Sequence, residues 1–214
     1  EWKAWWAKMK PNIVPPGPDG PCTPIPGAAF ASSGTAGPTT DRPAPKHPDI
    51  NFKVRGWVPT QATDKRLEII DIDGPTDDKA PRLNTLFVDE RKPVFTSLWD
   101  IGLFDGGLAK GVSPNGPHLF GFRTMPGEVL QCPWSGYQIA PRCLYADEDS
   151  LVLKYTSEDN IVMGYTVHYF GIAVEPNLLA AYQKSDAGGR RSMPCVRYKM
   201  PVGRARGGEI LFSI

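Results

Sequence analysis

The chain has 214 residues, with 24 lysines and arginines against 23 aspartates and glutamates, so its formal net charge is +1. It has no long basic run and no basic stripe interleaved with aromatic residues, which argues against nucleic acid as a partner. No apolar run reaches the roughly 18 residues that a membrane-spanning helix needs, so we expect no transmembrane segment.

The first ten residues predict a short amphipathic helix over residues 1–10. Four large apolar residues have the i, i+3, i+4, i+7 spacing that places side chains on one helix face. They are Trp2, Trp5, Trp6 and Met9. A helix this short is marginal in water by itself. We therefore expect this face to dock on the chain's own domain, on another copy or partner, or on a membrane surface.

Residues 11–48 hold eleven prolines among small residues. Each proline fixes φ and removes a backbone donor, which predicts an extended, semi-rigid linker or arm. Many short alternating stretches separated by turn residues follow, and they favour a mainly β fold. We expect an antiparallel sheet or sandwich-like domain with one or two short helices. Residues 49–110 would form an N-terminal β subdomain and residues 111–214 a second β domain.

Seven stretches in this part are typical of strands. They are residues 50–59, 65–74, 92–104, 127–133, 150–156, 161–170 and 207–214. The sequence SEDN between two of them predicts a tight hairpin turn. The clearest helix is expected over residues 175–185, with Pro176 at its first position.

Four cysteines give an even count, which favours two disulfides in an oxidising compartment. The candidates are Cys22, Cys132, Cys143 and Cys195. None forms a short C-x2-C pair, which argues against a structural zinc site. Cys132 and Cys143 could close the segment between them, but three pairings are compatible with the sequence. Four reduced thiols are the alternative.

Two acidic runs, at residues 71–74 and 147–150, look like calcium loops. A calcium loop of the helix–loop–helix type needs alternating oxygen ligands, a central glycine and a closing glutamate. Neither run has that spacing, so we expect solvated turns. A calcium site assembled from distant loops is the alternative.

Three histidines, His47, His118 and His168, are the candidate zinc ligands or general acids. His168 lies in an alternating stretch and would share a strand face with Val162, Thr166 and Phe170. A single histidine on such a face is more often a hydrogen-bonded packing residue. We therefore assign no catalytic residue, no metal ligand and no cofactor, with zinc and calcium kept as alternatives.

Three stretches after Gly111 resemble, in order, the motif run of the lysostaphin-type, or LytM-like, zinc endopeptidases of peptidoglycan. They are PHLFGFRTMPGEVLQCPWSG (117–136), LVLKYTSEDNIVMGYTVHYF (151–170) and MPVGRARGGEILFSI (200–214). The first stands where that family has its His-x-x-x-Asp run. The second is similar to its hairpin, with Tyr165 and His168 near the family's Tyr and His. The third is similar to its closing strand, and the resemblance implies an antiparallel β domain.

The departures from this pattern imply a lost metal site. Phe122 stands four residues after His118, where the family has Asp, and Glu209 and Leu211 occupy the two closing histidine positions. Leucine cannot bind zinc, so His118 is the one ligand position retained. His168 would match the family's catalytic histidine, which is not a ligand. The resemblance therefore implies a degenerate domain that kept the sheet.

Three further stretches resemble a group of uncharacterised secreted bacterial proteins. They are HPDINFKVRGW (47–57), LKYTSEDNIVMGYTVHYFGIAVEPNLLAAYQ (153–183) and GRARGGEI (203–210). This resemblance implies an extracellular or cell-surface, wall-associated location. We expect a non-catalytic structural or binding protein that self-associates or binds cell-wall glycan. Copies would link through the N-terminal arm or by addition to the last strand, which a net charge near zero favours.

Two other classes of protein are the alternatives. One is a zinc-dependent peptidoglycan endopeptidase using His118, His168 and a carboxylate, either Glu128 or Glu209, to hold or assist the metal. The other is a carbohydrate-binding module whose aromatic side chains stack on sugar rings. Its candidates are Trp57, Trp99, Trp134 and Tyr137.

Overall fold

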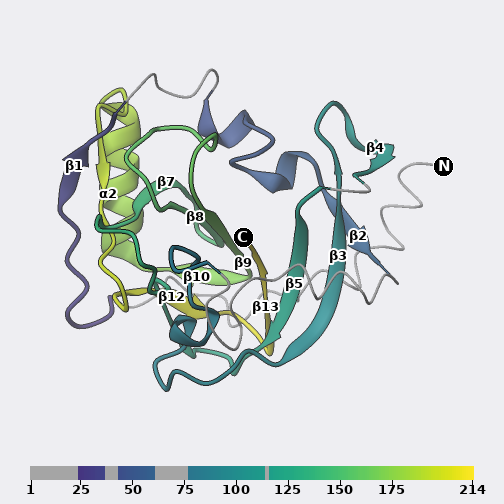
Figure 1. Ribbon diagram of the computed structural model, residues 1–214, viewed down its shortest axis with the longest axis horizontal. Coiled ribbons are helices and arrows are strands. Elements are labelled where there is room, and N and C mark those ends of the chain that lie inside the picture. Colours follow the sequence, from purple (N-terminus) through teal and green to yellow (C-terminus); the bar gives the residue numbers. More distant parts are fainter. Residues whose placement is uncertain (1–23, 37–42, 61–76, 114–115) are drawn as a thin grey trace.

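The computed structural model describes residues 24–36, 43–60, 77–113 and 116–214 (Figure 1). Several expectations fall outside these ranges. They are the helix over residues 1–10 with Trp2, Trp5, Trp6 and Met9, the strand over 65–74 with its acidic run, and Cys22.

The described residues form thirteen strands and one α-helix, which confirms the mainly β, antiparallel expectation. The largest sheet has the order β2-β3-β5-β13-β9-β8-β7, with β4 paired to β3. Its strands are β2 (Trp57–Pro59), β3 (Phe95–Leu103), β4 (Gly107–Val112), β5 (His118–Arg123), β7 (Arg142–Ala146), β8 (Ser150–Lys154), β9 (Thr166–Phe170) and β13 (Glu209–Ser213).

A second sheet has three strands, each of which adjoins a strand of the large sheet in the chain. It runs β10-β12-β6, from β10 (Ile172–Val174), β12 (Pro201–Ala205) and β6 (Val129–Gln131). Each of these strands is the chain neighbour of β9, β13 or β5 in the large sheet. Gly171, at φ 76°, separates β9 from β10, and this left-handed backbone lets the chain bend at little cost. Three neighbouring strands thus pass from one sheet into the other, as in orthogonally packed sandwiches.

Apolar side chains alternate along the central strands and form two clusters on opposite faces of the large sheet. The larger cluster includes Phe120, Phe122, Val167, Tyr169 and Phe212. The smaller cluster is Phe52, Trp99, Ile101, Leu119, Phe170 and Leu211, with Trp57 packed against it. Burial of these side chains is the main stabilising contribution to such a fold.

The expected helix is α2 (Pro176–Ala187). Glu175 is its N-cap and accepts a hydrogen bond from the Leu178 backbone N–H at 2.9 Å, while Pro176 needs no partner in the first turn. Three short 3-10 helices complete the elements: η2 (Ala44–Lys46), η3 (Phe52–Val54) and η5 (Leu83–Leu86). No described helix has the length and apolar character needed to cross a membrane.

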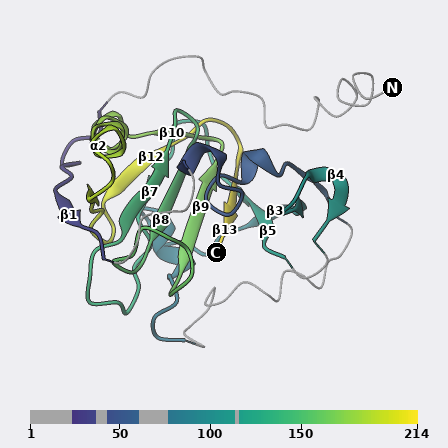
Figure 2. The same cartoon turned by 90° about the horizontal axis from the view of Figure 1, so that it is seen from above.

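Part of the expected linker over residues 11–48 is fixed to the domain. Within residues 24–36, β1 (Ser32–Gly34) pairs with β11 (Ser192–Pro194). Further along, Ala44 of η2 is fully buried. Figure 2 shows β1 lying outside the sheet beside α2. Proline richness correctly indicates an extended chain here. It does not reveal that the remaining backbone donors bind an edge strand.

The division at residue 110 also needs correction, because the two proposed β parts share one sheet. β3 and β5 are hydrogen-bonded neighbours, and the boundary falls inside β4. Ladder hydrogen bonds therefore join the two parts, which the spacing of strands along the chain cannot show.

Two expectations about the C-terminal strands are wrong. β8 ends at Lys154 and β9 begins at Thr166, so a long loop over residues 155–165 replaces the tight turn. Val162 lies in this loop and is 80% exposed. The last strand, β13, has β5 on one side and β9 on the other. β13 therefore has no free edge, and another copy cannot add a strand to it.

Candidate functional site

His118 and His168 lie on opposite faces of the large sheet. Phe212 of β13 is opposite both Phe120 on β5 and Tyr169 on β9. Side chains alternate along strands, so His118 shares the face of Phe120, whereas His168 shares the face of Phe170. Two side chains separated by the sheet cannot bind the same metal ion.

His118 is buried and contacts its cross-strand neighbour. Its Nε2 lies 3.2 Å from Oδ1 of Asp100, which is its partner in the β3–β5 ladder. The imidazole also packs 6.4 Å from the ring of Phe120. His118 therefore ties two strands together on the face of the larger cluster.

His168 is buried under an aromatic ring. Phe52 stacks on it with ring centroids 4.1 Å apart and planes at 13°. Burial lowers the pKa of His168 to about 3, although a hydrogen bond with the backbone of Ile50 partly opposes this. His168 is therefore a neutral side chain that packs at ordinary pH.

The two candidate carboxylates are engaged elsewhere. Glu209 accepts hydrogen bonds from the hydroxyls of Ser97, at 2.7 Å, and Thr96. It lies four residues before Ser213, the neighbour of His168, which is about 13 Å along the strand. Glu128 forms an ion pair with Arg91 at 2.9 Å. In the described part of the chain, no three His, Cys, Asp or Glu side chains gather closely enough to hold a metal.

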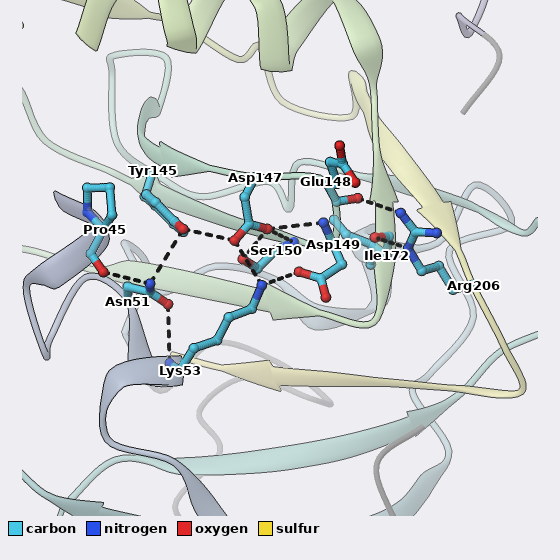
Figure 3. A network of polar contacts seen from close by, with 10 residues as sticks. All are labelled: Pro45, Asn51, Lys53, Tyr145, Asp147, Glu148, Asp149, Ser150, Ile172 and Arg206. Carbon is cyan, nitrogen blue, oxygen red and sulfur yellow. Dashed lines mark hydrogen bonds and ion pairs between the residues drawn. The ribbon is translucent and has the colours of Figure 1, made fainter. Parts of the chain in front are cut away.

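The acidic run at residues 147–150 closes the β7–β8 hairpin (Figure 3). One oxygen of Asp147 accepts the backbone N–H groups of Asp149 and Ser150 at 3.0 and 2.8 Å, and the Ser150 hydroxyl at 2.7 Å. Its other oxygen accepts from the Tyr145 hydroxyl and from Lys53 Nζ, both at 2.8 Å. The ligand oxygens a cation would use are thus occupied by internal donors.

Lys53 also contacts Asp149, so one ammonium group forms ion pairs with both aspartates. Burial opposes ionisation of Asp147, but Lys53 and the donors of Asp149 and Ser150 outweigh it. They hold the pKa of Asp147 well below its usual range. This arrangement is a structural turn.

The segment around Lys53 crosses the smaller cluster and is held at both ends. Asn51 donates to the Pro45 carbonyl at 2.9 Å (Figure 3). Arg55 donates to the Gly102 carbonyl at 2.6 Å and pairs with Asp49 at 3.0 Å. This segment therefore covers His168 and joins the β7–β8 turn to β3.

The clearest binding surface is occupied by the chain itself. We call residues 24–36 the strap, and we call the surface beneath it the flank. The flank consists of β11 with Arg142, Glu158, Glu175 and Cys195. The strap runs along this surface as an extended chain, from Ile25 at the start of α2 to Ala36 at the loop over residues 155–165.

Backbone groups of the strap make most of its hydrogen bonds with the flank. The carbonyl of Ala31 accepts from the Cys195 N–H at 2.7 Å, and the Ala36 N–H donates to the Ser157 carbonyl at 2.8 Å. Arg142 donates to the Gly34 carbonyl at 2.9 Å. The three side chains of β1 are exposed. The flank therefore holds an extended backbone largely irrespective of its side chains.

Two buried charged side chains of the flank take some of their hydrogen-bond partners from the strap. Glu175 is fully buried, and its Oε1 accepts the Ile25 N–H at 3.4 Å. Arg142 is 6% exposed, and its guanidinium donates to both Ser33 and Gly34. Each also has partners within the domain, since Glu175 accepts from Leu178 and Asn177, and Arg142 donates to the Thr156 carbonyl.

A fully buried lysine lies next to this surface. Lys154 is the ladder neighbour of Arg142 on one side and Thr166 on the other. Burial lowers its pKa to about 8, with Glu158 opposing the shift. Its ammonium donates to the Met163 carbonyl, which ties β8 to the loop over residues 155–165.

The three described cysteines, Cys132, Cys143 and Cys195, are free thiols, and no disulfide joins any two of them. Cys132 lies 3.9 Å from the Tyr155 hydroxyl, whereas Cys143 lies 3.5 Å from the Tyr145 carbonyl. The two thiols fill different positions in the core. Burial raises the pKa of Cys132 to about 12, and it raises the pKa of Cys143 as well. Cys195 is half-buried beside the strap.

The four aromatic candidates for sugar stacking fall into two groups. Trp57 and Trp99 belong to the smaller cluster, where Trp57 lies 5.0 Å from the ring of Phe170. Trp134 is 39% exposed, and Tyr137 packs against the larger cluster. The four do not make one continuous platform.

Comparison of the chain with protein-family models, curated proteins and solved structures gave no match. The residues that build the flank and the β7–β8 turn carry no motif. Only the Glu-Pro pair at residues 175–176 is a usual sequence pattern, because it is typical of a helix start.

Proposed function

We propose that the chain is a non-catalytic structural or binding protein that assembles with its own copies through its N-terminal helix and arm, residues 1–48. The observation that carries this proposal is the fastening of residues 24–36 to the outside of the domain. The arm thereby has a fixed point of attachment, and Trp2, Trp5, Trp6 and Met9 precede it in the sequence.

The placement of the candidate catalytic groups supports the same proposal. His118, His168 and Glu209 each make structural contacts, and they lie on different faces or at different heights of the sheet. A hydrolytic zinc site needs three ligands and a water around one point. The described arrangement favours a scaffold over a zinc peptidase.

Two exposed apolar side chains near the end of the strap add to this support. Val162 is 80% exposed and Met163 is 61% exposed, in the loop that Ala36 contacts. Together with a formal net charge of +1, which gives little repulsion between copies, they favour association. A location outside the cell or at its surface is part of the proposal and rests on the sequence resemblance.

Light scattering on the full chain over a wide concentration range tests the proposal. Substituting Trp2, Trp5 and Trp6 by Ala is expected to lower the measured mass. The matched control substitutes Lys3, Lys8 and Lys10 by Ala, and it should preserve the oligomer. A full chain that is monomeric at every concentration would overturn the proposal.

A further inference from the structure

We infer that the strap is exchanged between copies, so that residues 24–36 of one chain occupy the flank of a second copy. This inference rests on the proposed function, and it names the contact by which the arm would assemble the protein. It concerns a surface that the chain already occupies with its own segment.

The flank requires an extended occupant in either arrangement. The buried carboxylate of Glu175 and the guanidinium of Arg142 take their strap partners from backbone groups of Ile25 and Gly34. The backbone groups of β11 likewise pair with those of β1. An empty flank would lose these hydrogen bonds and leave β11 without a partner strand, so release of one strap favours capture of another.

A strap from a second copy would satisfy the same partners. β1 binds through its backbone and has exposed side chains, and Ile25 is the buried apolar residue of the segment. The contacts made within one chain and between two chains are therefore the same. Exchange of an identical element is a low-cost route to a closed dimer, because the contact energies cancel.

A short segment joins the strap to the rest of the domain. Six residues, 37–42, separate Ala36 from Pro43. Seven Cα–Cα steps span up to about 25 Å when extended, which sets the largest distance over which a strap could pass to a second copy. Reciprocal exchange between two copies would give twofold symmetry.

A single new cysteine reports which chain supplies the strap. Cys195 follows Pro194, the ladder partner of Ser32, and it donates to the Ala31 carbonyl at 2.7 Å. Directly opposed residues of antiparallel strands have the Cα separation that a disulfide needs. The variant is therefore Ala31→Cys, made together with Cys22→Ser so that only one other thiol lies near the strap.

The purified variant is oxidised at several concentrations and separated on a non-reducing gel, with its mass in solution measured beforehand. Exchange predicts covalent dimers that disappear on reduction, and peptide mapping should join position 31 to Cys195. The same variant with Cys195→Ser should give no such dimer. A second pair, Gly34→Cys with Ser192→Cys in a chain carrying Cys22→Ser and Cys195→Ser, tests the next part of the ladder.

The outcomes separate this inference from the proposed function. Oligomers in solution with disulfides formed only within single chains would overturn strap exchange. They would leave assembly through the aromatic face of residues 1–10 as the proposed function. Monomers at every concentration, again with only internal disulfides, would overturn both.

Discussion

Phe52 lies almost flat on His168, with ring centroids 4.1 Å apart and ring planes at 13°. This contact seals the imidazole from solvent and joins the segment over residues 43–58 to the centre of the sheet. His168, one of the three histidines weighed as zinc ligands, is thereby part of the apolar packing.

The first prediction concerns pH. The pKa of His168 is lowered to about 3, so the unfolded chain binds a proton below about pH 6.5 while the folded chain does not. His168 therefore lowers the free energy of unfolding only below about pH 6.5, where the unfolded chain alone takes up the proton. As the pH drops from about 6.5 towards 3, the free energy of unfolding should fall by up to about 1.4 kcal/mol per pH unit. The variant His168→Phe should lose this component of the slope in denaturation measured between pH 3 and 7. His47→Gln should keep it, and an unchanged slope in His168→Phe would contradict the assignment.

A second prediction concerns the buried ion pair that holds the loop over residues 155–165. Arg190 binds Asp159 through Nε at 2.9 Å and Nη2 at 2.7 Å, and Asp159 is fully buried. Burial opposes the charge of Arg190, but the hydrogen bonds and charge of Asp159 outweigh it and raise its pKa. Asp159→Ala would leave the buried guanidinium with only the partly exposed Asp186 as its ion-pair partner, and it should cost about 3 kcal/mol of stability.

The matched control for this pair is Asp186→Ala. Asp186 also contacts Arg190, at 2.5 Å, but its side chain is 38% exposed. Its loss should cost less than about 1 kcal/mol. Equal losses for the two variants, measured by denaturant unfolding, would show that burial of Asp159 does not decide the effect.

The expected hairpin shows where prediction from sequence stops. Alternation correctly indicated strands ending at residue 170, but the turn residues SEDN do not form the turn. Asp159, in that motif, is instead drawn into the core by Arg190, 31 residues away in the chain. An ion pair between residues far apart in the chain leaves no local sequence pattern. It can therefore override the turn propensity of SEDN in a way that the sequence does not reveal.

The helix α2 and the strap also show which features the sequence can predict and which it cannot. Local sequence patterns predict the start of the helix at residues 175–176 and the mainly β class of the fold. Glu175, however, also accepts the N–H of Ile25, 150 residues earlier in the chain. Proline-rich composition indicates an extended segment, and only the tertiary structure shows what it binds.

A third prediction concerns the β7–β8 turn. Asp147 accepts five hydrogen bonds, whereas the carboxylate of Glu148 is exposed (Figure 3). Asp147→Ala should therefore lower the free energy of unfolding by about 2 kcal/mol, and Glu148→Ala should leave it within about 0.5 kcal/mol of the parent. Thermal or denaturant unfolding of the two variants measures the difference. A loss in Glu148→Ala as large as in Asp147→Ala would contradict this view of the turn.

A fourth prediction concerns the thiols. Thiolates are the reactive species, and burial raises the pKa of Cys132 to about 12. Cys132 and Cys143 should therefore resist a thiol reagent until the chain unfolds, while the half-buried Cys195 reacts faster. Mass spectrometry of timed labelling distinguishes the sites. Rapid labelling of Cys132 in the folded chain would contradict its burial.

Assembly through the N-terminal arm is the central claim, and the mass of the full chain in solution tests it most directly. Light scattering should give a multiple of the chain mass, and this mass should fall when Trp2, Trp5 and Trp6 are replaced by Ala. A single-chain mass for the unaltered protein across the whole concentration range would contradict the account.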